Sequence, residues 1–398
     1  MKIIYWLGLV ILPLTCQPLP TLNNSVAILP PELQSTSLFV SGADGYHTYR
    51  IPSLIVTPKG TLLAFTEGRV DGRGDAGDID LLLKRSTDGG RTWSRQQVVW
   101  DDGGHTCGNP CPVVDLETGV IWLLLTWNRG TDHEKDIIYH NSEDTRRAFV
   151  CYSDDDGQTW SEPVEITRAV KQADWGWYAT GPGVGIQLRR GQYQGRLVVP
   201  ANHSYTVSDS LGGLWGGPYG YGSHVIYSDD HGRTWQISAA ITPGCNESQV
   251  VELADGTLMM NMRSYNNRGS RAIATSQDGG ETWSEIWHDD ILIESRCQAS
   301  FLRYSIRDDG GRNRLLFSNP ATGVGRHHLT VRLSYDEGAT WPVSKLLHEG
   351  PTAYSCLAVL PGGDIACLYY TASLESRERS LVFTRFSLYW LTGGKDKL

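Results

Sequence analysis

One eight-residue pattern, Ser-x-Asp-x-Gly-x-Thr-Trp, occurs five times in this chain of 398 residues and constrains its fold more than any other feature. The copies begin at Ser86, Ser153, Ser228, Ser276 and Ser334. In each copy the Asp carboxylate is suited to accept hydrogen bonds from backbone N–H groups further along, and the Gly permits a positive φ. We therefore interpret each copy as a tight turn between two strands, in which the Asp is a structural group and not a catalytic acid.

The copies recur at intervals of about 50 to 75 residues, which is typical of one four-stranded sheet followed by a connecting segment of variable length. Short apolar runs at residues 197–199 and 257–260 favour strands over helices. The prediction is an all-β, six-bladed β-propeller in which five blades carry the turn motif. The sixth blade is expected to close by pairing a strand near residues 37–40 with strands near 381–391. The repeated Trp is expected to fill the gap between neighbouring sheets.

The chain is predicted to form one folded domain with short terminal segments. Lys2 precedes an apolar run at residues 3–14 that is too short to span a bilayer, so residues 1–16 resemble a secretory signal. Residues 17–35 are interpreted as a linker, 36–392 as the propeller and 393–398 as a C-terminal tail. We expect a secreted, periplasmic or cell-surface protein. Lipid attachment at Cys16 is the less favoured alternative.

The formal net charge of −9 argues against a nucleic-acid-binding protein, although an acidic protein can still bind an anion in a locally cationic cleft. Cys107 and Cys111 are four residues apart, but no second Cys/His pair has the spacing of a zinc site. Most of the eight Cys are interpreted as small core residues. We expect no metal, no cofactor and a monomer.

The first polar motif is Tyr-Arg-Ile-Pro, with Arg50 at its second position, followed by Glu67-Gly68-Arg69. A loop at residues 70–80 then carries four Asp residues, which from composition alone are a calcium site, a source of acid and base groups, or solvated turn residues. Solvated turn residues are the reading that composition favours. An Arg is by itself a weak signal, since most Arg side chains are solvated or paired at the surface.

In chain order, these motifs and the turn motif resemble the start of an exo-α-sialidase (neuraminidase) of the bacterial and animal type, where the turn motif is called the Asp box. The similarity runs from about residue 46 to about residue 390. It implies that Arg50 binds the carboxylate of sialic acid and that Asp75 is the general acid and base. It also implies that Arg69 contacts the region of the sugar 4-hydroxyl.

Five further residues match family motifs later in the chain. Asn109, in Gly-Asn-Pro, either approaches the 4-hydroxyl or is only a turn residue before proline. The resemblance implies that Arg263 and Arg326 complete a triad of arginines around the carboxylate. It also implies that Tyr354 is the nucleophile and that Glu247 is its base.

This set of residues has a chemical rationale. Three guanidiniums give charge-assisted, partly bidentate binding of one carboxylate. Sialic acid carries its carboxylate on the anomeric carbon, so an Asp or Glu nucleophile would approach against like charge, whereas a Tyr avoids this repulsion. The predicted activity is hydrolysis of terminal sialic acids from glycoproteins, glycolipids or oligosaccharides, with retention of configuration.

The sequence departs from the family at Tyr370, where Cys-Leu-Tyr-Tyr stands in place of the usual Cys-Leu-Tyr-Glu. That Glu pairs with the first Arg in the family, and a neutral Tyr cannot replace its charge. Glu67 or Asp364 is the expected substitute. We expect an altered substrate preference and not inactivity.

Two alternatives remain open at the sequence level. A trans-sialidase would keep the same site but transfer the sugar to another sugar instead of water. A non-enzymatic, sialic-acid-binding propeller would keep the turn motifs without the chemistry, and Tyr370 is the best support for it. His203 and Tyr205 are candidate rim contacts, as are aromatic residues in the segment 211–221.

Overall fold

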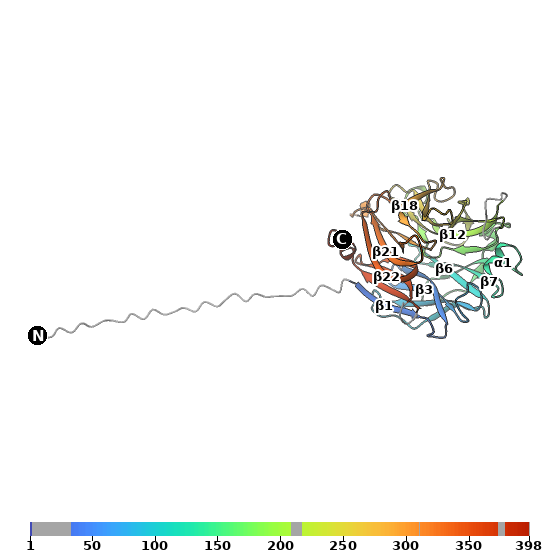
Figure 1. Ribbon diagram of the computed structural model, residues 1–398, viewed down its shortest axis with the longest axis horizontal. Helices are drawn as coiled ribbons and strands as arrows, with labels where there is room; N and C mark the ends of the chain where they lie inside the picture. Colours follow the sequence, from blue (N-terminus) through green and yellow to red (C-terminus); the bar gives the residue numbers. More distant parts are fainter. Residues whose placement is uncertain (2–32, 208–216, 310, 373–378, 398) are drawn as a thin grey trace. The chain divides into compact units, whose positions relative to one another are not determined.

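Antiparallel strands make up most of the computed structural model, which describes residues 1, 33–207, 217–309, 311–372 and 379–397 (Figure 1). The strands form four hydrogen-bonded sheets. The eight-stranded sheet contains β2 (Thr48–Val56), β3 (Leu62–Arg69), β4 (Ile79–Ser86), β5 (Gln97–Trp100), β6 (Thr106–Val114), β7 (Ile121–Asn128), β8 (Arg147–Ser153) and β9 (Val164–Glu165). The five-stranded sheet contains β10 (Tyr178–Thr180), β11 (Ile186–Gln187), β12 (Leu197–Thr206), β13 (Tyr219–Ser228) and β14 (Gln236–Ile237).

The two remaining sheets come from the C-terminal half of the chain and from its first strand. The four-stranded sheet contains β15 (Cys245–Glu252), β16 (Leu258–Ser264), β17 (Ser270–Ser276) and β18 (Trp287–Ile293). The seven-stranded sheet contains β1 (Leu33–Val40), β19 (Ser300–Ser305), β20 (Arg314–Pro320), β21 (His327–Ser334), β22 (Val343–Val359), β23 (Ile365–Ala372) and β24 (Arg379–Phe386). Helices are short: α1 (Glu134–Ile138), α2 (Thr167–Val170), α3 (Leu388–Leu391) and the 3-10 turns Gly191–Tyr193 and Arg307–Asp309.

The first strand joins the last sheet, as the sequence predicted. β1 pairs antiparallel with β24, with Leu33 opposite Phe386 and Val40 opposite Ser380, and Figure 1 shows β1 in blue beside the red C-terminal strands. Two predicted boundaries were wrong. β1 already begins at Leu33, inside the expected linker, and residues 388–391 form α3 and not a strand. The signal-like segment 1–16 and residues 17–32 of the linker lie outside the described residues, apart from Met1.

The turn motif forms the same hydrogen bonds in each copy. In the second copy, Ser153 Oγ donates to Asp155 Oδ1 (2.8 Å), which also accepts from Thr159 N (2.9 Å), and Thr159 Oγ1 donates to Asp155 Oδ2 (2.6 Å). The Trp that ends this motif, Trp160, packs edge-on against Phe65 of β3 at 5.6 Å. The same bonds recur at Asp88, Asp230, Asp278 and Asp336. The motif therefore closes a turn and places an aromatic ring against a separate part of the sheet system.

A segment at residues 181–185, after β10, is hydrogen-bonded to strands β2 and β15 and to Gln298. Ser53 Oγ of β2 donates to the carbonyl of Gly183 (2.7 Å), Ser248 N of β15 donates to that of Gly181 (3.2 Å), and Gln298 Nε2 donates to that of Pro182 (3.2 Å). Gly183 has φ +139°, and a Cβ there would lie 2.5 Å from the Gln249 side chain. Only glycine fits this close approach. The segment thus ties together strands that carry the candidate site.

The end of the chain is anchored, which corrects the expectation of a tail at 393–398. Arg314 of β20 donates from Nε and Nη2 to the two carboxylate oxygens of Asp396, at 2.8 and 2.7 Å. Tyr335 OH also donates to Asp396 (2.9 Å). Both charged side chains are buried, at 4% and 7% exposure. Residues up to 397 therefore belong to the folded unit that begins at Leu33.

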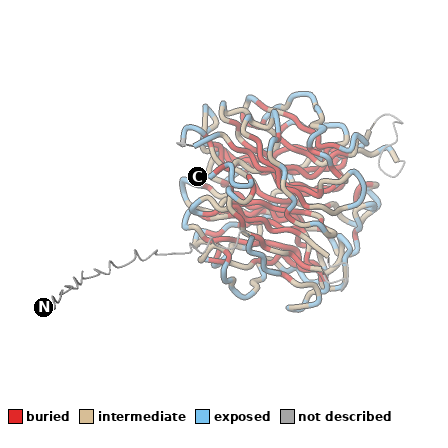
Figure 2. Tube along the Cα trace, turned by 60° about the vertical axis from the view of Figure 1, so that its left-hand side comes forward, coloured by how far each residue is buried: buried red, intermediate tan, exposed pale blue. Residues whose placement is uncertain are grey.

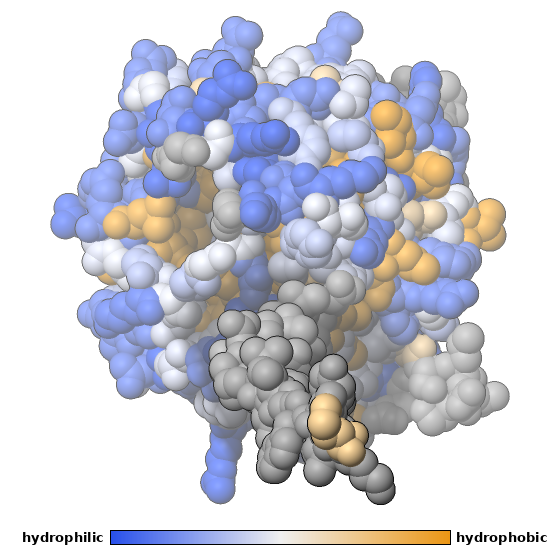
Figure 3. All heavy atoms as spheres, turned by 90° about the vertical axis from the view of Figure 1, so that its left-hand side faces the viewer, coloured by the Kyte–Doolittle hydropathy of each residue, from blue (hydrophilic) through white to orange (hydrophobic). Residues whose placement is uncertain are grey.

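Burial follows the strands, and the loops carry most of the exposed residues (Figure 2). All seven described Cys are buried and unpaired, in agreement with their interpretation as core residues. The face drawn in Figure 3 is largely hydrophilic, with hydrophobic side chains interspersed. Among the described helices, none is both long and apolar enough to span a bilayer.

Candidate active site

Four of the predicted site residues lie at irregularities in the pairing of strands β2, β6, β15 and β22. The strand pairing shifts between Arg50 and Ser53 in β2, between Gly108 and Cys111 in β6, between Cys245 and Ser248 in β15, and between Thr352 and Ser355 in β22. Each shift is a β-bulge, which breaks the alternation of side chains and redirects one of them. These bulges hold Arg50, Asn109, Glu247 and Tyr354.

Two of the bulges also contain strained backbone. Ile51 has φ 61° and Asn109 has φ 53°, in the left-handed region that β-branched residues such as Ile avoid. Each precedes a proline, Pro52 or Pro110. Such strain persists only where the surrounding structure enforces it, and it is concentrated at functional sites.

Tyr354 and Glu247 form a direct pair, although they are more than 100 residues apart in the chain. Tyr354 OH donates a hydrogen bond to Glu247 Oε1. Arg263 of β16 donates from Nη1 both to Glu247 Oε2 (2.7 Å) and to Tyr354 OH (3.3 Å). Tyr354 and Glu247 are each 7% exposed. The carboxylate is therefore fixed between a phenol and a guanidinium.

The environment keeps the Tyr354 phenol protonated in the free protein. Burial raises the pKa of Tyr354 well above its ordinary value, the Glu247 carboxylate raises this pKa further, and Arg263 acts in the opposite direction. The phenol can become an oxygen nucleophile only as it passes its proton to an adjacent base. Glu247 is the carboxylate placed to accept this proton.

A second cluster is formed by Arg50 of β2, Arg69 at the end of β3 and Asp75 on the loop that follows β3. Arg50 Nη1 lies 2.9 Å from Asp75 Oδ1, and Arg69 Nη1 lies 2.8 Å from the same oxygen. Arg69 is buried and also contacts Glu67 Oε2 at 2.5 Å. Asp75 is exposed and thus accessible to a ligand, whereas Arg69 serves as its fixed anchor.

The charges in this cluster determine the protonation state of Asp75. Desolvation acts to raise the pKa of Asp75, but the guanidiniums of Arg69 and Arg50 outweigh it and hold this pKa below its usual range. Asp75 is therefore ionised in the free protein at neutral pH. A ligand carboxylate that engaged Arg50 would remove one of the two stabilising contacts.

The two expected substitutes for the missing family Glu do not contact Arg50. Glu67 pairs with Arg69 and accepts from the backbone N–H of Asn109 with its other oxygen (2.9 Å). Asp364 pairs with Arg385 at 2.6 Å. The expectation that either residue neutralises Arg50 was wrong, and Asp75 is the carboxylate that Arg50 contacts.

All eight predicted site residues line one cavity of about 180 Å³. They are Arg50, Arg69, Asp75, Asn109, Glu247, Arg263, Arg326 and Tyr354. Arg326 lies with its guanidinium 5.9 Å from the centre of the Tyr354 ring, and its Nη2 donates to the carbonyl of Arg296 (2.6 Å). Three guanidiniums from separate strands and loops thus face the same space as the Tyr354–Glu247 pair.

Sequence reasoning missed a buried group on another wall of this cavity. Arg146 donates to Asn109 Oδ1 (2.5 Å) and to Asn128 Oδ1 (2.6 Å), and its guanidinium stacks 4.0 Å from the Trp177 ring. Burial lowers the pKa of Arg146 to about 10. One signal was available: Arg146 is in phase with the buried positions Ala148 and Val150 of β8.

Glu134 and Tyr265, which also line the cavity, were missed as well. Glu134 lies on the short helix α1, accepts a hydrogen bond from Tyr221 OH (2.5 Å), and has a pKa raised by burial. No sequence pattern marked it. Tyr265 accepts a bond from Arg263 Nη2 (2.6 Å), and its place two residues after Arg263, near the end of β16, is a period-2 signal that could have found it.

His203 is not a rim residue, contrary to the expectation. It is 1% exposed, stacks 3.4 Å from the Trp175 ring, and its Nδ1 lies 3.0 Å from His224 Nδ1. Neither His203 nor Tyr205 lines the cavity. Residues 208–216 of the aromatic segment lie outside the described residues, whereas Tyr221 contacts Glu134 from behind the cavity wall.

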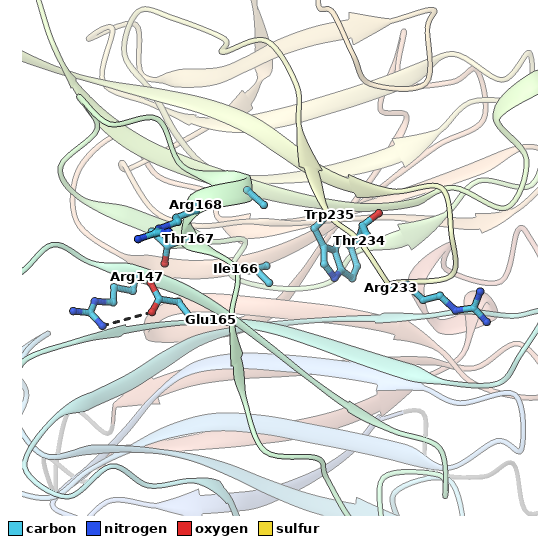
Figure 4. Close-up of a pocket in the computed structure, with 9 residues that line it drawn as sticks. Arg147, Glu165, Ile166, Thr167, Arg168, Arg233, Thr234 and Trp235 are labelled. Carbon is cyan, nitrogen blue, oxygen red and sulfur yellow. Dashed lines mark ion pairs between the residues drawn. The ribbon is translucent and has the colours of Figure 1, made fainter.

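A larger, separate surface pocket of about 730 Å³ contains none of the predicted site residues (Figure 4). Figure 4 shows Arg147 and Glu165 side by side, with their nearest N and O atoms 3.6 Å apart, and Arg168 and Arg233 directed away from each other. It offers no paired acid and nucleophile. Within the described ranges, no group of three or more His, Cys, Asp or Glu side chains is placed to hold a metal ion.

Comparisons with known proteins give matches over most of the chain. A family model described as a BNR repeat-like domain matches residues 60–367. A sialidase from Micromonospora viridifaciens is 35% identical over 91% of this chain, and an exo-alpha-sialidase from Aspergillus fumigatus is 30% identical over 94% of it. Among solved structures, the Hadza microbial sialidase Hz136 has a TM-score of 0.77 and 32% identity, over 90% of this chain and 69% of its own.

The lengths of these relatives differ. The chain spans 55% of the Micromonospora viridifaciens sialidase and 61% of a Bacteroides fragilis sialidase that is 34% identical over 83% of this chain, but 91% of the Aspergillus fumigatus protein. Solved sialidases with this fold are β-propellers, which agrees with the all-β architecture described above. The match over most of the chain and over nearly the whole of one relative is sufficient to conclude that this chain belongs to the sialidase family.

Proposed function

We propose that the chain is an exo-α-sialidase that hydrolyses terminal sialic acids from glycoconjugates with retention of configuration. One observation carries the proposal. The hydrogen-bonded pair of Tyr354 and Glu247 faces the same cavity as Arg50, Arg263 and Arg326. A phenol paired with a base next to three cations suits a substrate whose carboxylate is attached to the carbon under attack.

We also propose six blades of four strands around one axis. The four hydrogen-bonded sheets divide into six such sets, because β22 is long enough to serve two neighbouring sets and β4 is joined to β6 by a single parallel bridge. In the five-stranded sheet, the short strands β10 and β11 both pair with β12 and together take the place of one strand. The sixth set contains β22, β23, β24 and β1. This arrangement supports the proposed site, since Arg50, Asn109, Glu247 and Tyr354 all lie on the first strand of their sets.

In the proposed first step, the sialate carboxylate binds Arg50, Arg263 and Arg326. Arg50 then exchanges Asp75 for the substrate, so that the pKa of Asp75 rises and the carboxyl group is protonated more readily. Protonated Asp75 donates its proton to the glycosidic oxygen as the bond to the aglycone breaks. Binding of the correct substrate thereby prepares the acid.

The nucleophile acts at the same time. Tyr354 passes its proton to Glu247, and its oxygen forms a bond to the anomeric carbon. Arg263 contacts both groups and stabilises the negative charge as it moves from the Glu247 carboxylate to the Tyr354 oxygen. Asp75 then removes a proton from water, the water oxygen attacks the anomeric carbon, and Tyr354 leaves with the proton returned by Glu247.

We further propose that the protein is exported and acts on sialylated glycoproteins, glycolipids or oligosaccharides. The support for export is the apolar run at residues 3–14 after Lys2. The support for the substrates is the family membership and the sugar-sized cavity. Arg69 and Asn109 are proposed to contact the sugar near its 4-hydroxyl.

Replacement of Tyr354 by Phe tests the function. We expect turnover of 4-methylumbelliferyl sialoside to fall by about 10³-fold or more, because the nucleophilic oxygen is removed while the ring remains. Tyr152→Phe, at an exposed Tyr far from the cavity, is the matched control and should keep full activity. Undiminished turnover by Tyr354→Phe would refute the assignment. Sialoside binding by the native protein without any turnover would favour a binding protein, and transfer to added lactose would identify a trans-sialidase.

A further inference from the structure

A second cavity adjoins the candidate active site. It has a volume of about 430 Å³ and shares four lining residues with the active-site cavity: Arg50, Ile51, Arg326 and Tyr354. The two cavities therefore meet at the residues that are proposed to hold the sialate carboxylate and to attack the anomeric carbon. In the following paragraphs this second cavity is called the adjoining cavity.

The lining of the adjoining cavity is strongly cationic. Among the described residues, its lining contains four guanidiniums, those of Arg50, Arg73, Arg326 and Arg379, and no carboxylate. Within the described part of the chain, no carboxylate forms an ion pair with Arg73, Arg326 or Arg379, and only Arg50 has one, with Asp75. Asp75 itself lines the active-site cavity and not the adjoining one.

Tyr370 determines this charge balance. It lines the adjoining cavity together with Arg50 and Arg326, at the position where the family usually has a Glu. The backbone carbonyl of Tyr370 accepts a hydrogen bond from Thr352 Oγ1 (2.8 Å), so the strand position is fixed. A phenol at this position supplies hydrogen bonds but no negative charge at neutral pH. With Arg50 and Arg326 assigned to the sialate carboxylate, Arg73 and Arg379 are the two described guanidiniums of the cavity that are left for the rest of the ligand.

The place of the adjoining cavity relative to the reaction follows from the substrate. This step rests on the proposed sialidase function. The carboxylate and the aglycone of a sialoside are both attached to the anomeric carbon. With the carboxylate on Arg50 and Arg326 and the ring in the cavity that contains Glu134 and Trp177, the aglycone must leave beside these shared arginines. The adjoining cavity opens from there.

We propose that the adjoining cavity is an aglycone subsite that favours an acidic sugar next to the sialic acid that is removed. The ligand chemistry is a sulfate ester or a carboxylate, and two sources carry it: a sulfated galactose, or a second sialic acid in an oligosialyl chain. Arginine binds both groups through charge-assisted hydrogen bonds. A concave cationic surface also raises the local concentration of such anions.

The test compares substrates that differ in the charge of the aglycone. The first pair is 3′-sialyllactose with and without a sulfate on the 6-hydroxyl of galactose, and the second is disialyllactose against 3′-sialyllactose. The measured quantity is kcat/KM for release of the terminal sialic acid. We expect both acidic substrates to be preferred by the native protein at low ionic strength. The preference should shrink when the ionic strength rises from about 10 mM to about 150 mM, because the screening length falls from about 30 Å to about 8 Å.

Two variants localise the effect. In Arg379→Gln and in Arg73→Gln, the ratio of kcat/KM for the acidic over the neutral substrate should fall by about two- to five-fold, as expected for a partly exposed charge contact. Arg168→Gln, in the separate pocket of Figure 4, removes the same charge elsewhere and should leave the ratio unchanged. Tyr370→Glu should lower the ratio further, since it places a negative charge inside the cavity.

The outcomes separate this proposal from the proposed function. The subsite proposal would be overturned if the ratio of kcat/KM for the acidic over the neutral substrate were unchanged in both Arg379→Gln and Arg73→Gln. This includes the case in which kcat/KM falls equally for both substrates. Such a result leaves the sialidase activity standing. If the variants lose only the preference for the sulfated substrate, the group that the cavity binds is sulfate. If they lose only the preference for disialyllactose, it is a second sialic acid. Absence of turnover with all three substrates would refute the sialidase function itself.

Discussion

Asp75 is held between two guanidiniums, and this position controls when it can act as an acid. In the free protein the pKa of Asp75 lies below its usual range because Arg69 and Arg50 stabilise the carboxylate. Only the protonated form donates a proton to the leaving oxygen. The fraction in that form therefore falls as the pH rises, and the substrate must displace Arg50 to restore it.

We predict that kcat/KM for 3′-sialyllactose decreases from mildly acidic to alkaline pH, and that Asp75→Ala lowers it by about 10²- to 10⁴-fold while removing this pH dependence. The loss should be much smaller for 4-methylumbelliferyl sialoside, because its acidic phenol leaves without a proton. Steady-state kinetics on both substrates across pH provide the measurement. Equal losses on the two substrates would contradict the role of Asp75 as the acid.

At this scale, the sequence identified the residues whose motifs are local. Arg50, Asp75, Glu247 and Tyr354 each stand in a short pattern, and the structure brings them to one cavity. The sequence did not reveal that Arg50 contacts Asp75, because the two residues meet only through the fold of the loop after β3. Arg146 and Glu134 were missed since their places depend on packing between distant segments.

Among the elements, the turn motifs bind their own loops through the Asp carboxylate. Asp155 accepts hydrogen bonds from Ser153, Gln158 and Thr159. Although desolvation acts to raise it, these bonds lower the pKa of Asp155 to about 2. A carboxyl group with a lowered folded-state pKa stabilises the protein above its unfolded value, and this contribution disappears as the pH falls towards 2.

We predict that Asp155→Ala lowers the free energy of unfolding by about 1–2 kcal/mol, because several backbone and hydroxyl donors lose their acceptor at once. Its neighbour Asp154 is exposed and no side-chain hydrogen bond involves it among the described residues, so Asp154→Ala is the matched control. Urea unfolding at neutral pH should separate the two variants, and the difference between Asp155→Ala and the native protein should narrow at low pH. A loss as large in Asp154→Ala would show that the motif bonds are not responsible.

The β-bulges are a feature of the strands that could not be predicted from the sequence. Strand positions were predicted from apolar runs, and β12 and β16 occur where the runs at residues 197–199 and 257–260 place them. The register shifts at Arg50, Glu247 and Tyr354 leave no apolar periodicity in the sequence. They depend on how the inner strands converge, which is a property of the assembled sheets.

For the whole molecule, the bond between Arg314 and Asp396 attaches the end of the chain to β20. Arg314 lowers the pKa of Asp396, so the pair contributes stability at neutral pH that is lost as the pH falls through the folded-state pKa. Both side chains are buried, and removal of one partner leaves the other charge without its counterion. The tail predicted from the sequence is therefore a structural element.

We predict that Asp396→Ala lowers the free energy of unfolding by about 2–4 kcal/mol, since Arg314 remains buried without its carboxylate. Lys397→Ala, at an exposed neighbour, is the control and should change it by less than about 0.5 kcal/mol. Urea unfolding followed by tryptophan fluorescence measures both. An unchanged free energy of unfolding in Asp396→Ala would mean that the C-terminal segment detaches freely.

The pairing of β1 with β24 has a consequence for biosynthesis. Residues 33–40 leave the ribosome hundreds of residues before their partner strand at 379–386 exists. During that interval the edge of β1 has no native neighbour. Completion of the seven-stranded sheet is thus deferred until residues 379–386 have been synthesised, and a nascent chain stalled before residue 379 should expose an unsatisfied strand edge that chaperones or other nascent chains can bind.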